Sequence, residues 1–248
     1  MIRSLWGSKA RQEQRDDGAY DSARGLITLE QPTSAASEAY RSIRTNLLYG
    51  FVDHPKVILL TSAGPGEGKS TTCANLGVVL AQAAKDTLIL DCDLRRPVIH
   101  KFFEVRNVHG IMDVMVGERG LQEVWHEPIE GLKVVTVGQQ PVNPAEILGT
   151  RYFSQFLASL REKFDYVLID ASPVVAVSDP AIIATQGDGV LLVVDAQNTR
   201  RGALRQSVRL LEAVGANILG TVMNNAILDE MSYYYGDYSY GSKEEPVT

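Results

Sequence analysis

Short runs of aliphatic residues recur along the sequence, and longer segments of helical pattern separate most of them. The runs are continuous, as in Leu191-Leu192-Val193-Val194, and lack the alternation of a strand with one wet face. Such runs are typical of parallel strands covered on both sides, so their alternation with helices predicts an open α/β sheet. We expect strands at 57–60, 87–90, 132–137, 166–169, 190–194 and 218–222, and helices within 32–51 and at 70–84, 152–163 and 202–214.

The chain of 248 residues suits one large domain with a segment of different composition at each end. Residues 1–30 are polar and without periodicity, so we expect a flexible lead-in. Residues 31–230 carry the alternating pattern, and their first helix is expected to be capped by Ser34 or Ser37. Residues 231–248 are rich in tyrosine and are expected to form a flexible tail.

Charge and hydropathy exclude several classes of protein. The sequence has 24 Lys and Arg against 30 Asp and Glu, a net charge of −6, which does not favour nucleic acid as a partner. No apolar stretch approaches the roughly 18 to 20 residues of a membrane-spanning helix. The two cysteines imply no disulfide framework, and a cytoplasmic setting is expected.

The first aliphatic run leads into a phosphate-binding loop. Glycines, a lysine and a serine follow a strand and open a helix, which is the pattern that lets backbone N–H groups surround a phosphate. Lys69 is expected to contact the β- and γ-phosphates of ATP, and the Ser70 hydroxyl to bind Mg²⁺. Ala63 stands where the usual pattern begins with glycine. The residues expected to bind ATP are Gly64, Pro65, Gly66, Glu67, Gly68, Lys69, Ser70 and Thr71.

Acidic residues follow two other aliphatic runs directly. Asp91 and Asp93 come after the run at 87–90, and Asp170 comes after the run at 166–169. Ligands of open α/β sheets bind beyond the C-terminal ends of the strands, so we expect these carboxylates beside the loop. Asp170 is expected to hold Mg²⁺ with Ser70, and Asp91 and Asp93 can reach the same ion. Either of these two can take the proton of a hydroxyl nucleophile, and the sequence leaves the choice open.

The three segments AGPGEGKST, LILDCDLR and VLIDASP together resemble the nucleotide-binding motifs of the bacterial tyrosine kinases, or BY-kinases. The resemblance extends over about residues 33–241 and implies a P-loop NTPase-type, mostly parallel sheet flanked by helices on both faces. It implies ATP and Mg²⁺ as cofactors, with Lys69, Asp91, Asp93 and Asp170 as catalytic residues.

Two further segments resemble features of the same family. Glu38, Arg41 and Arg44 fit the E-x-x-R-x-x-R element that joins BY-kinase subunits into a ring, although their spacing also suits a solvated charged helix face. The tail resembles the cluster that these kinases phosphorylate on one another. Its tyrosines are Tyr233, Tyr234, Tyr235, Tyr238 and Tyr240.

Because it has no apparent spanning segment, the chain resembles the CpsD/CapB-like type of BY-kinase, which is encoded apart from its membrane domain. That resemblance implies a role in capsule or exopolysaccharide synthesis and export. It implies recruitment to the inner face of the cell membrane by an adaptor of the polysaccharide co-polymerase type, and a cognate tyrosine phosphatase.

Two other functions compete with this interpretation. A MinD/ParA-like ATPase switch would carry an additional lysine five residues before Lys69, where this chain has Gly64. A nucleotide-sensing scaffold with little kinase activity would need most of the same residues, so the sequence does not exclude it.

Overall fold

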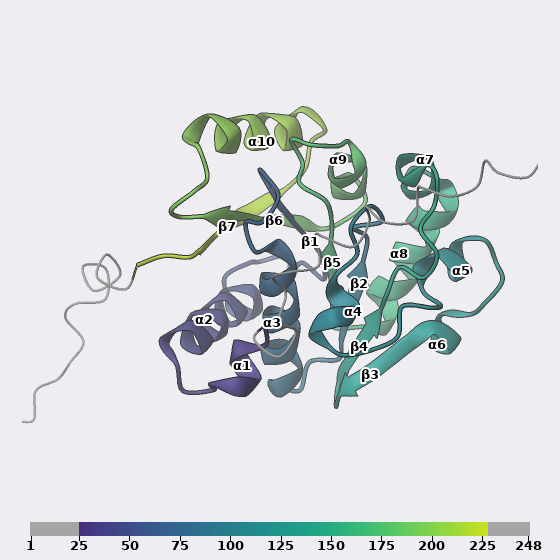
Figure 1. Cartoon of the computed structure of the whole chain (residues 1–248), viewed down its shortest axis with the longest axis horizontal. Coiled ribbons are helices and arrows are strands. Elements are labelled where there is room, and N and C mark those ends of the chain that lie inside the picture. Colours follow the sequence, from purple (N-terminus) through teal and green to yellow (C-terminus); the bar gives the residue numbers. More distant parts are fainter. Residues whose placement is uncertain (1–24, 228–248) are drawn as a thin grey trace, which may run out of the picture.

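In the computed structural model, which describes residues 25–227, a seven-stranded sheet lies between two groups of helices (Figure 1). The strand order is β3-β4-β2-β5-β1-β6-β7. Every neighbouring pair is parallel except β3 with β4. The strands are β1 (Val57–Ser62), β2 (Thr87–Asp91), β3 (Trp125–Ile129), β4 (Leu132–Val135), β5 (Tyr166–Asp170), β6 (Gly189–Asp195) and β7 (Ile218–Asn224).

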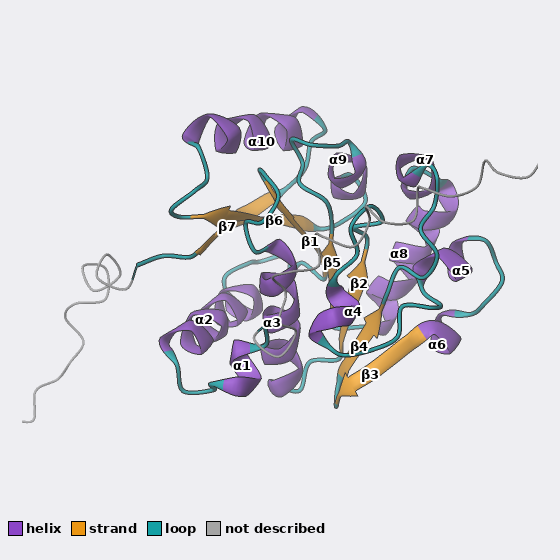
Figure 2. Cartoon of the chain, viewed as in Figure 1, coloured by secondary structure: helices purple, strands orange, loops and turns teal. Residues whose placement is uncertain are grey.

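One face of the sheet is covered by the four helices that occur first in the sequence (Figure 2). Among them α3 is buried along almost its whole length and packs on β1, β2 and β5. Leu47 of α2 and Ile99 of α4 complete this core. The four helices are α1 (Ile27–Glu30), α2 (Ala35–Tyr49), α3 (Lys69–Gln82) and α4 (Ile99–Phe102).

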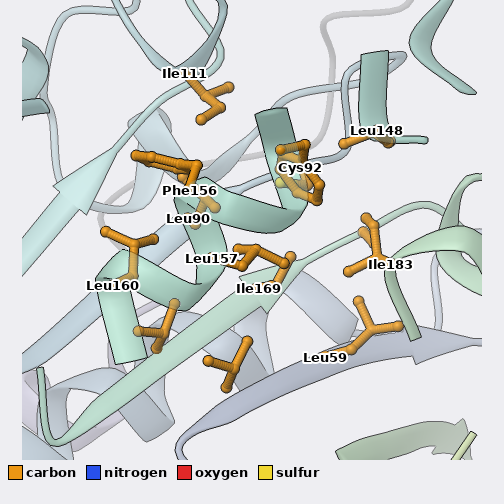
Figure 3. Packing of buried hydrophobic residues seen from close by; sticks show 14 of the residues in the cluster. Leu59, Leu90, Cys92, Ile111, Leu148, Phe156, Leu157, Leu160, Ile169 and Ile183 are labelled. Carbon is orange, nitrogen blue, oxygen red and sulfur yellow. The ribbon is translucent and has the colours of Figure 1, made fainter. Parts of the chain in front are cut away.

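The opposite face carries the second core. Leu59, Leu90 and Ile169 of the sheet belong to one cluster with Leu157 of α8 and Ile183 of α9 (Figure 3). The helices that contribute to this core are α5 (Ile111–Met115), α6 (Leu121–Val124), α7 (Pro144–Leu148), α8 (Arg151–Lys163), α9 (Asp179–Ala184) and α10 (Arg201–Ala213). Burial on both faces explains why the strands read as continuous aliphatic runs.

All six expected strands and all four expected helices are present, with shifts of one or two residues at most of their ends. Strand β3 was not expected. Its sequence, WHEPI, is no aliphatic run, because β3 is an antiparallel edge strand with partly exposed side chains, a position that tolerates proline. The short helices α1, α4, α5, α6, α7 and α9 were also not expected, since four to six residues show too little periodicity.

The structure places a helix, α1, at residues 27–30, within the expected lead-in. Thr28 is buried, and its N–H and its hydroxyl both donate to Asn75 Oδ1 on α3, at 3.1 and 2.9 Å. Ser34, and not Ser37, caps α2: its Oγ accepts the Ser37 N–H, while the Ser37 hydroxyl donates to the Ile27 and Gln31 carbonyls. These contacts join α1 to the domain. The remaining expected boundaries lie outside the described residues.

The strand order sets the position of the functional site. β1 lies between β5 and β6, and β5 lies between β1 and β2. In register, Asp91 at the end of β2 is paired with Asp170 at the end of β5. The loop after β1 and the acids after β2 and β5 therefore meet at one edge of the sheet.

Candidate nucleotide-binding and phosphotransfer site

The phosphate-binding loop joins the end of β1 to the first residue of α3. Gly66 and Gly68 have positive φ angles of 79° and 88°, a conformation that favours glycine. At Gly68 a Cβ atom would also clash with Nδ2 of Asn224, so a side chain there would have to displace Asn224. The N-terminus of α3, a helix of 14 residues, faces the loop and favours bound anions.

Four predicted residues lie within contact distance of one another at this edge. Lys69 Nζ lies 2.8 Å from Asp93 Oδ2 and 3.7 Å from Asp170 Oδ1. Lys69 Nζ also donates to Ser70 Oγ at 3.1 Å, and the Ser70 hydroxyl donates to Asp170 Oδ2 at 2.6 Å. Residues from β1–α3, from the segment after β2 and from β5 thus form one connected group.

Asp91 and Asp93 have different surroundings. Both Asp91 oxygens accept backbone N–H groups, Oδ1 that of Asp93 and Oδ2 that of Ile99, so Asp91 holds the turn that follows β2. Asp93 Oδ1 accepts the Ser172 hydroxyl at 2.7 Å and the Arg96 N–H, while its Oδ2 faces Lys69. Of the two acids, only Asp93 has an oxygen, Oδ2, that faces the loop lysine without accepting a backbone N–H.

Burial and charge shift the pKa values of this group. Burial raises the pKa of Asp170, although Lys69 and the Ser70 hydroxyl oppose the rise. Burial, Asp170 and Asp93 raise the pKa of Asp91 well above its usual value. For Lys69, burial lowers the pKa, but Asp170 and Asp93 more than offset it and hold it above the ordinary value. The cluster thus places three carboxyl groups around a single lysine.

The residues present fit a magnesium ion. Asp170 Oδ1 is buried and accepts no hydrogen bond from any residue between 25 and 227. Carboxylate and hydroxyl oxygens are the ligands that Mg²⁺ takes in phosphotransfer sites, where water and substrate phosphates complete its shell. Within this range no three His, Cys, Asp or Glu side chains are grouped so as to hold a metal ion by themselves.

A cavity of about 190 Å³ opens between the loop and the turn after β2. Most residues expected to bind ATP line it, and Asp93 lines it as well. Gly64 and Glu67 do not line it, and Asp91 and Asp170 lie buried behind its wall. The lining residues are Pro65, Gly66, Gly68, Lys69, Ser70, Thr71, Asp93, Arg96, Val98, Phe102 and Pro173.

The two arginines after Asp93 have separate roles in the structure. Arg95 makes a two-point ion pair with the fully buried Asp179 at the start of α9, at 2.8 and 3.2 Å. Arg96 is exposed and lines the cavity. Arg96 therefore places a positive charge at the mouth of the cavity.

A second cavity, of about 510 Å³, adjoins the first at Thr71, which lines both. Its walls come from α2, from the start of α3 and from the end of β7, where Asn224 and Asn225 lie. The sequence interpretation missed these two asparagines. They follow an aliphatic run just as the aspartates do, so the same rule identifies them.

The three residues of the expected oligomerisation element have different partners within the described chain. Glu38 and Arg41 pair with each other on exposed α2 at 2.8 Å. Arg44 instead turns toward α3 and donates from Nη1 to the Val79 carbonyl at 3.1 Å. The expected phosphorylation sites Tyr233, Tyr234, Tyr235, Tyr238 and Tyr240 lie outside the described residues.

Comparisons with known proteins agree with this geometry. Residues 53–240 match the ParA family model, described as NUBPL iron-transfer P-loop NTPase. Tyrosine-protein kinase YwqD of Bacillus subtilis is 36% identical over 89% of this chain and 93% of its own length. Putative tyrosine-protein kinase EpsB of Ralstonia solanacearum is 34% identical over 88% of this chain, which spans 29% of EpsB.

A solved structure extends the likeness to three dimensions. The kinase domain of the Escherichia coli tyrosine kinase ETK superposes with a TM-score of 0.78 and 29% identity, covering 90% of this chain and 84% of that one. No helix among residues 25–227 combines the length and the apolar character needed to cross a membrane. By its sequence relatives, its fold and its loop, the chain belongs to the bacterial tyrosine kinases, within the ParA group of P-loop proteins.

Proposed function

We propose that the chain transfers the γ-phosphoryl group of ATP to tyrosines in the C-terminal cluster of a neighbouring copy. The observation that carries this proposal is the convergence of Lys69, Ser70, Asp93 and Asp170 on one cavity behind a glycine loop. Phosphoryl transfer requires positioning and charge neutralisation rather than a covalent intermediate, and this group of residues can provide both.

The nucleotide is divided between the two cavities. The phosphates occupy the smaller one, against the loop amides and Lys69. The base occupies the larger one, whose walls combine apolar residues of α2 with the amides of Asn224 and Asn225. The support for this division is Thr71, which lines both cavities and so lies where a nucleotide passes from one to the other.

Ser70 and Asp170 would hold magnesium beside the cavity, Asp170 directly or through a water molecule. When bound, the ion offsets the negative charge of the phosphates as the transferred group leaves. Lys69 moves from Asp93 toward the phosphates, and Asp93 Oδ2 then becomes free to accept the proton of the incoming tyrosine. Asp91 holds the turn in place through its two backbone amides.

The test is a mixing experiment with two full-length variants. One carries an intact tail and Lys69→Met, so it serves only as substrate. The other keeps Lys69 but has phenylalanine at all five tail tyrosines, so it serves only as enzyme. With Mg-ATP, phosphotyrosine mapped by mass spectrometry should appear on the Lys69→Met chain alone.

Other outcomes of the mixing experiment identify the competing functions. ATP hydrolysis without phosphotyrosine would indicate a MinD/ParA-like switch. ATP binding without either reaction, even with the adaptor present, would indicate a nucleotide-sensing scaffold.

At the level of the cell we propose that this kinase regulates capsular or exopolysaccharide synthesis and export. In this role it associates into a ring through Glu38, Arg41 and Arg44. A membrane adaptor of the polysaccharide co-polymerase type recruits it from the cytoplasm, and a tyrosine phosphatase reverses the modification. The resemblance to the family supports these partners, and co-purification with the adaptor from membranes tests them.

A further inference from the structure

Glu67 lies in the middle of the phosphate-binding loop, yet its side chain faces away from the phosphate cavity. The residue is 8% exposed and does not line the cavity. Its Oε2 accepts the backbone N–H of Ala63, at the start of the loop, at 3.0 Å. Its Oε1 accepts the hydroxyl of Thr199 at 2.8 Å, from a turn 132 residues later in the sequence. The carboxylate therefore joins the loop to a separate part of the sheet edge.

The turn that carries Thr199 follows β6 and is itself tightly hydrogen-bonded. Thr199 Oγ1 accepts the Asp195 N–H at 2.9 Å. The Asp195 carboxylate accepts the N–H groups of Gln197 and Asn198 and the side-chain amides of Asn198 and Asn225. These bonds, those of Asn198 and Asn225 first, lower the pKa of Asp195 to about 2. The turn is thus held in one conformation and provides a fixed point for Glu67.

A second connection reaches the same loop from the end of β7. Asn224 Nδ2 donates to the backbone carbonyl of Glu67 at 3.3 Å and packs against Gly68, where it fills the space that a Cβ would need. Asn224 and Asn225 also line the larger cavity, in which the proposed function places the base. The loop is therefore fastened to the residues that form the base cavity.

We propose that Glu67 is a positioning residue whose carboxylate, held by Thr199, keeps the phosphate-binding loop in its anion-binding conformation and links it to the base cavity. The link runs from Ala63 through Glu67, Thr199 and Asp195 to Asn225. The inference rests on the proposed function, because it concerns the same nucleotide site.

The charge of Glu67 supports a positioning role. A carboxylate behind a phosphate-binding loop repels the bound phosphates, so its presence there requires a local reason. Both groups that it faces, the Ala63 N–H and the Thr199 hydroxyl, are donors, and the Thr199 oxygen already accepts from Asp195. Two acceptor oxygens are needed, which glutamate has and glutamine lacks.

The experiment compares Thr199→Val with Thr199→Ser in the full-length chain. Valine has the shape of threonine but no hydroxyl, whereas serine keeps the hydroxyl. ATP affinity is measured by titration calorimetry, and KM and kcat by the rate of tail phosphorylation. A hydrogen bond to a charged group is lost in the valine variant, so we expect the Kd and KM for ATP to rise about tenfold or more. We expect the serine variant to remain within about threefold of the unchanged chain.

Two further readouts separate positioning from general damage. The kcat at saturating ATP should change little in Thr199→Val, and the melting temperature of the nucleotide-free protein should fall by only about 2 to 4 °C. In the double variant Glu67→Gln/Thr199→Val, the fold loss of ATP affinity should be smaller than the product of the two single fold losses, because both changes break one connection. Where Thr199→Val does not fold, Glu67→Gln alone provides the same test, with the same rise in KM expected.

The outcomes distinguish the inference from the proposed function. Normal ATP affinity in Thr199→Val or in Glu67→Gln would overturn the inference while the kinase assignment stands, and so would equal losses in the valine and serine variants. Absence of ATP binding by the unchanged chain would overturn the proposed function itself, and the inference with it.

Discussion

Lys69 Nζ lies 2.8 Å from Asp93 Oδ2, so the loop lysine is paired with an acid. Both side chains are largely buried, and Asp93 is fixed on its other oxygen by the Ser172 hydroxyl. A phosphate group that binds to Lys69 therefore competes with this carboxylate for the lysine charge. This competition predicts that the two residues affect binding and catalysis in opposite directions.

The substitution Asp93→Asn should separate these two effects. Asparagine keeps one oxygen for Ser172 but loses the charge that holds Lys69, so Mg-free ATP should bind about two- to fivefold more tightly. Tail phosphorylation at saturating Mg-ATP should fall about 100-fold or more, because the proton acceptor is lost. Titration in the presence of EDTA and initial phosphorylation rates measure the two quantities. Weaker binding of Mg-free ATP by the variant would contradict the competition.

Asp170→Asn should remove the magnesium response without unfolding the chain. Asparagine can still accept the Ser70 hydroxyl, and it removes a buried charge, so the free energy of unfolding of the nucleotide-free protein should change by about 1 kcal/mol or less. The additional thermal stabilisation that Mg-ATP gives over ATP with EDTA should disappear. Melting curves under the two conditions provide the measurement, and a retained difference would show that Asp170 has no part in holding the ion.

The same variant tests the pH dependence of stability. The pKa values of Asp170 and Asp91 are raised in the folded chain, so the folded state binds their protons more tightly than the unfolded state does. The stability that these two groups contribute is fully present below pH of about 4, the ordinary pKa of aspartate, and is lost as the pH rises through their folded pKa values. Asp170→Asn abolishes one of the two titrations.

Urea unfolding of the nucleotide-free protein at several pH values between about 4 and 8 tests this expectation. The variant should gain stability relative to the unchanged chain as the pH rises. A difference in unfolding free energy that stays constant over this range would mean that the Asp170 carboxyl titrates normally. The pKa of Asp195 is instead lowered to about 2, so its contribution to the stability of the folded state is lost as the pH falls.

Arg41 and Arg44 should differ in their effects on stability. Arg44 satisfies the Val79 carbonyl in the last turn of α3, so Arg44→Ala should cost about 1 kcal/mol and lower the melting temperature by about 2 to 4 °C. Arg41 pairs with Glu38 and donates to the Pro32 carbonyl, but both contacts are exposed to solvent, so Arg41→Ala should have a smaller effect. Melting curves at a protein concentration at which each variant is monomeric make the comparison. Equal shifts for the two variants would be inconsistent with a structural role specific to Arg44.

Phosphorylation of the tail should loosen the proposed ring. Each phosphate adds about −1.5 to −2 charges, and a densely charged segment docks poorly beside an acidic cluster. Size-exclusion chromatography should show a smaller assembly for the phosphorylated chain than for the chain with phenylalanine at the five tail positions. The same elution volume for both forms would refute the idea.

The sequence predicted the parts of the site that depend on local spacing. The loop at 62–71 lies in one continuous segment, and Asp91 and Asp170 directly follow aliphatic runs, so the C-terminal edge of a parallel sheet could be expected to bring them together. The six aliphatic strands and the longer helices could be predicted as well, because their patterns are also local. The edge strand β3 and the first helix α1 were not, because tertiary contacts and not periodicity define them.

The sequence alone determined which chemical groups lie at each strand end, because residue type and local pattern can be taken directly from it. The tertiary structure decided how those ends are connected: Ser70 meets Asp170 across 100 residues, and Glu67 meets Thr199 across 132. The physical reason is the strand order, which places β1 between β5 and β6 and so brings together side chains whose separation in sequence carries no record of their contact. The same packing turns the Arg44 side chain toward α3 and the Glu67 side chain away from the phosphate cavity.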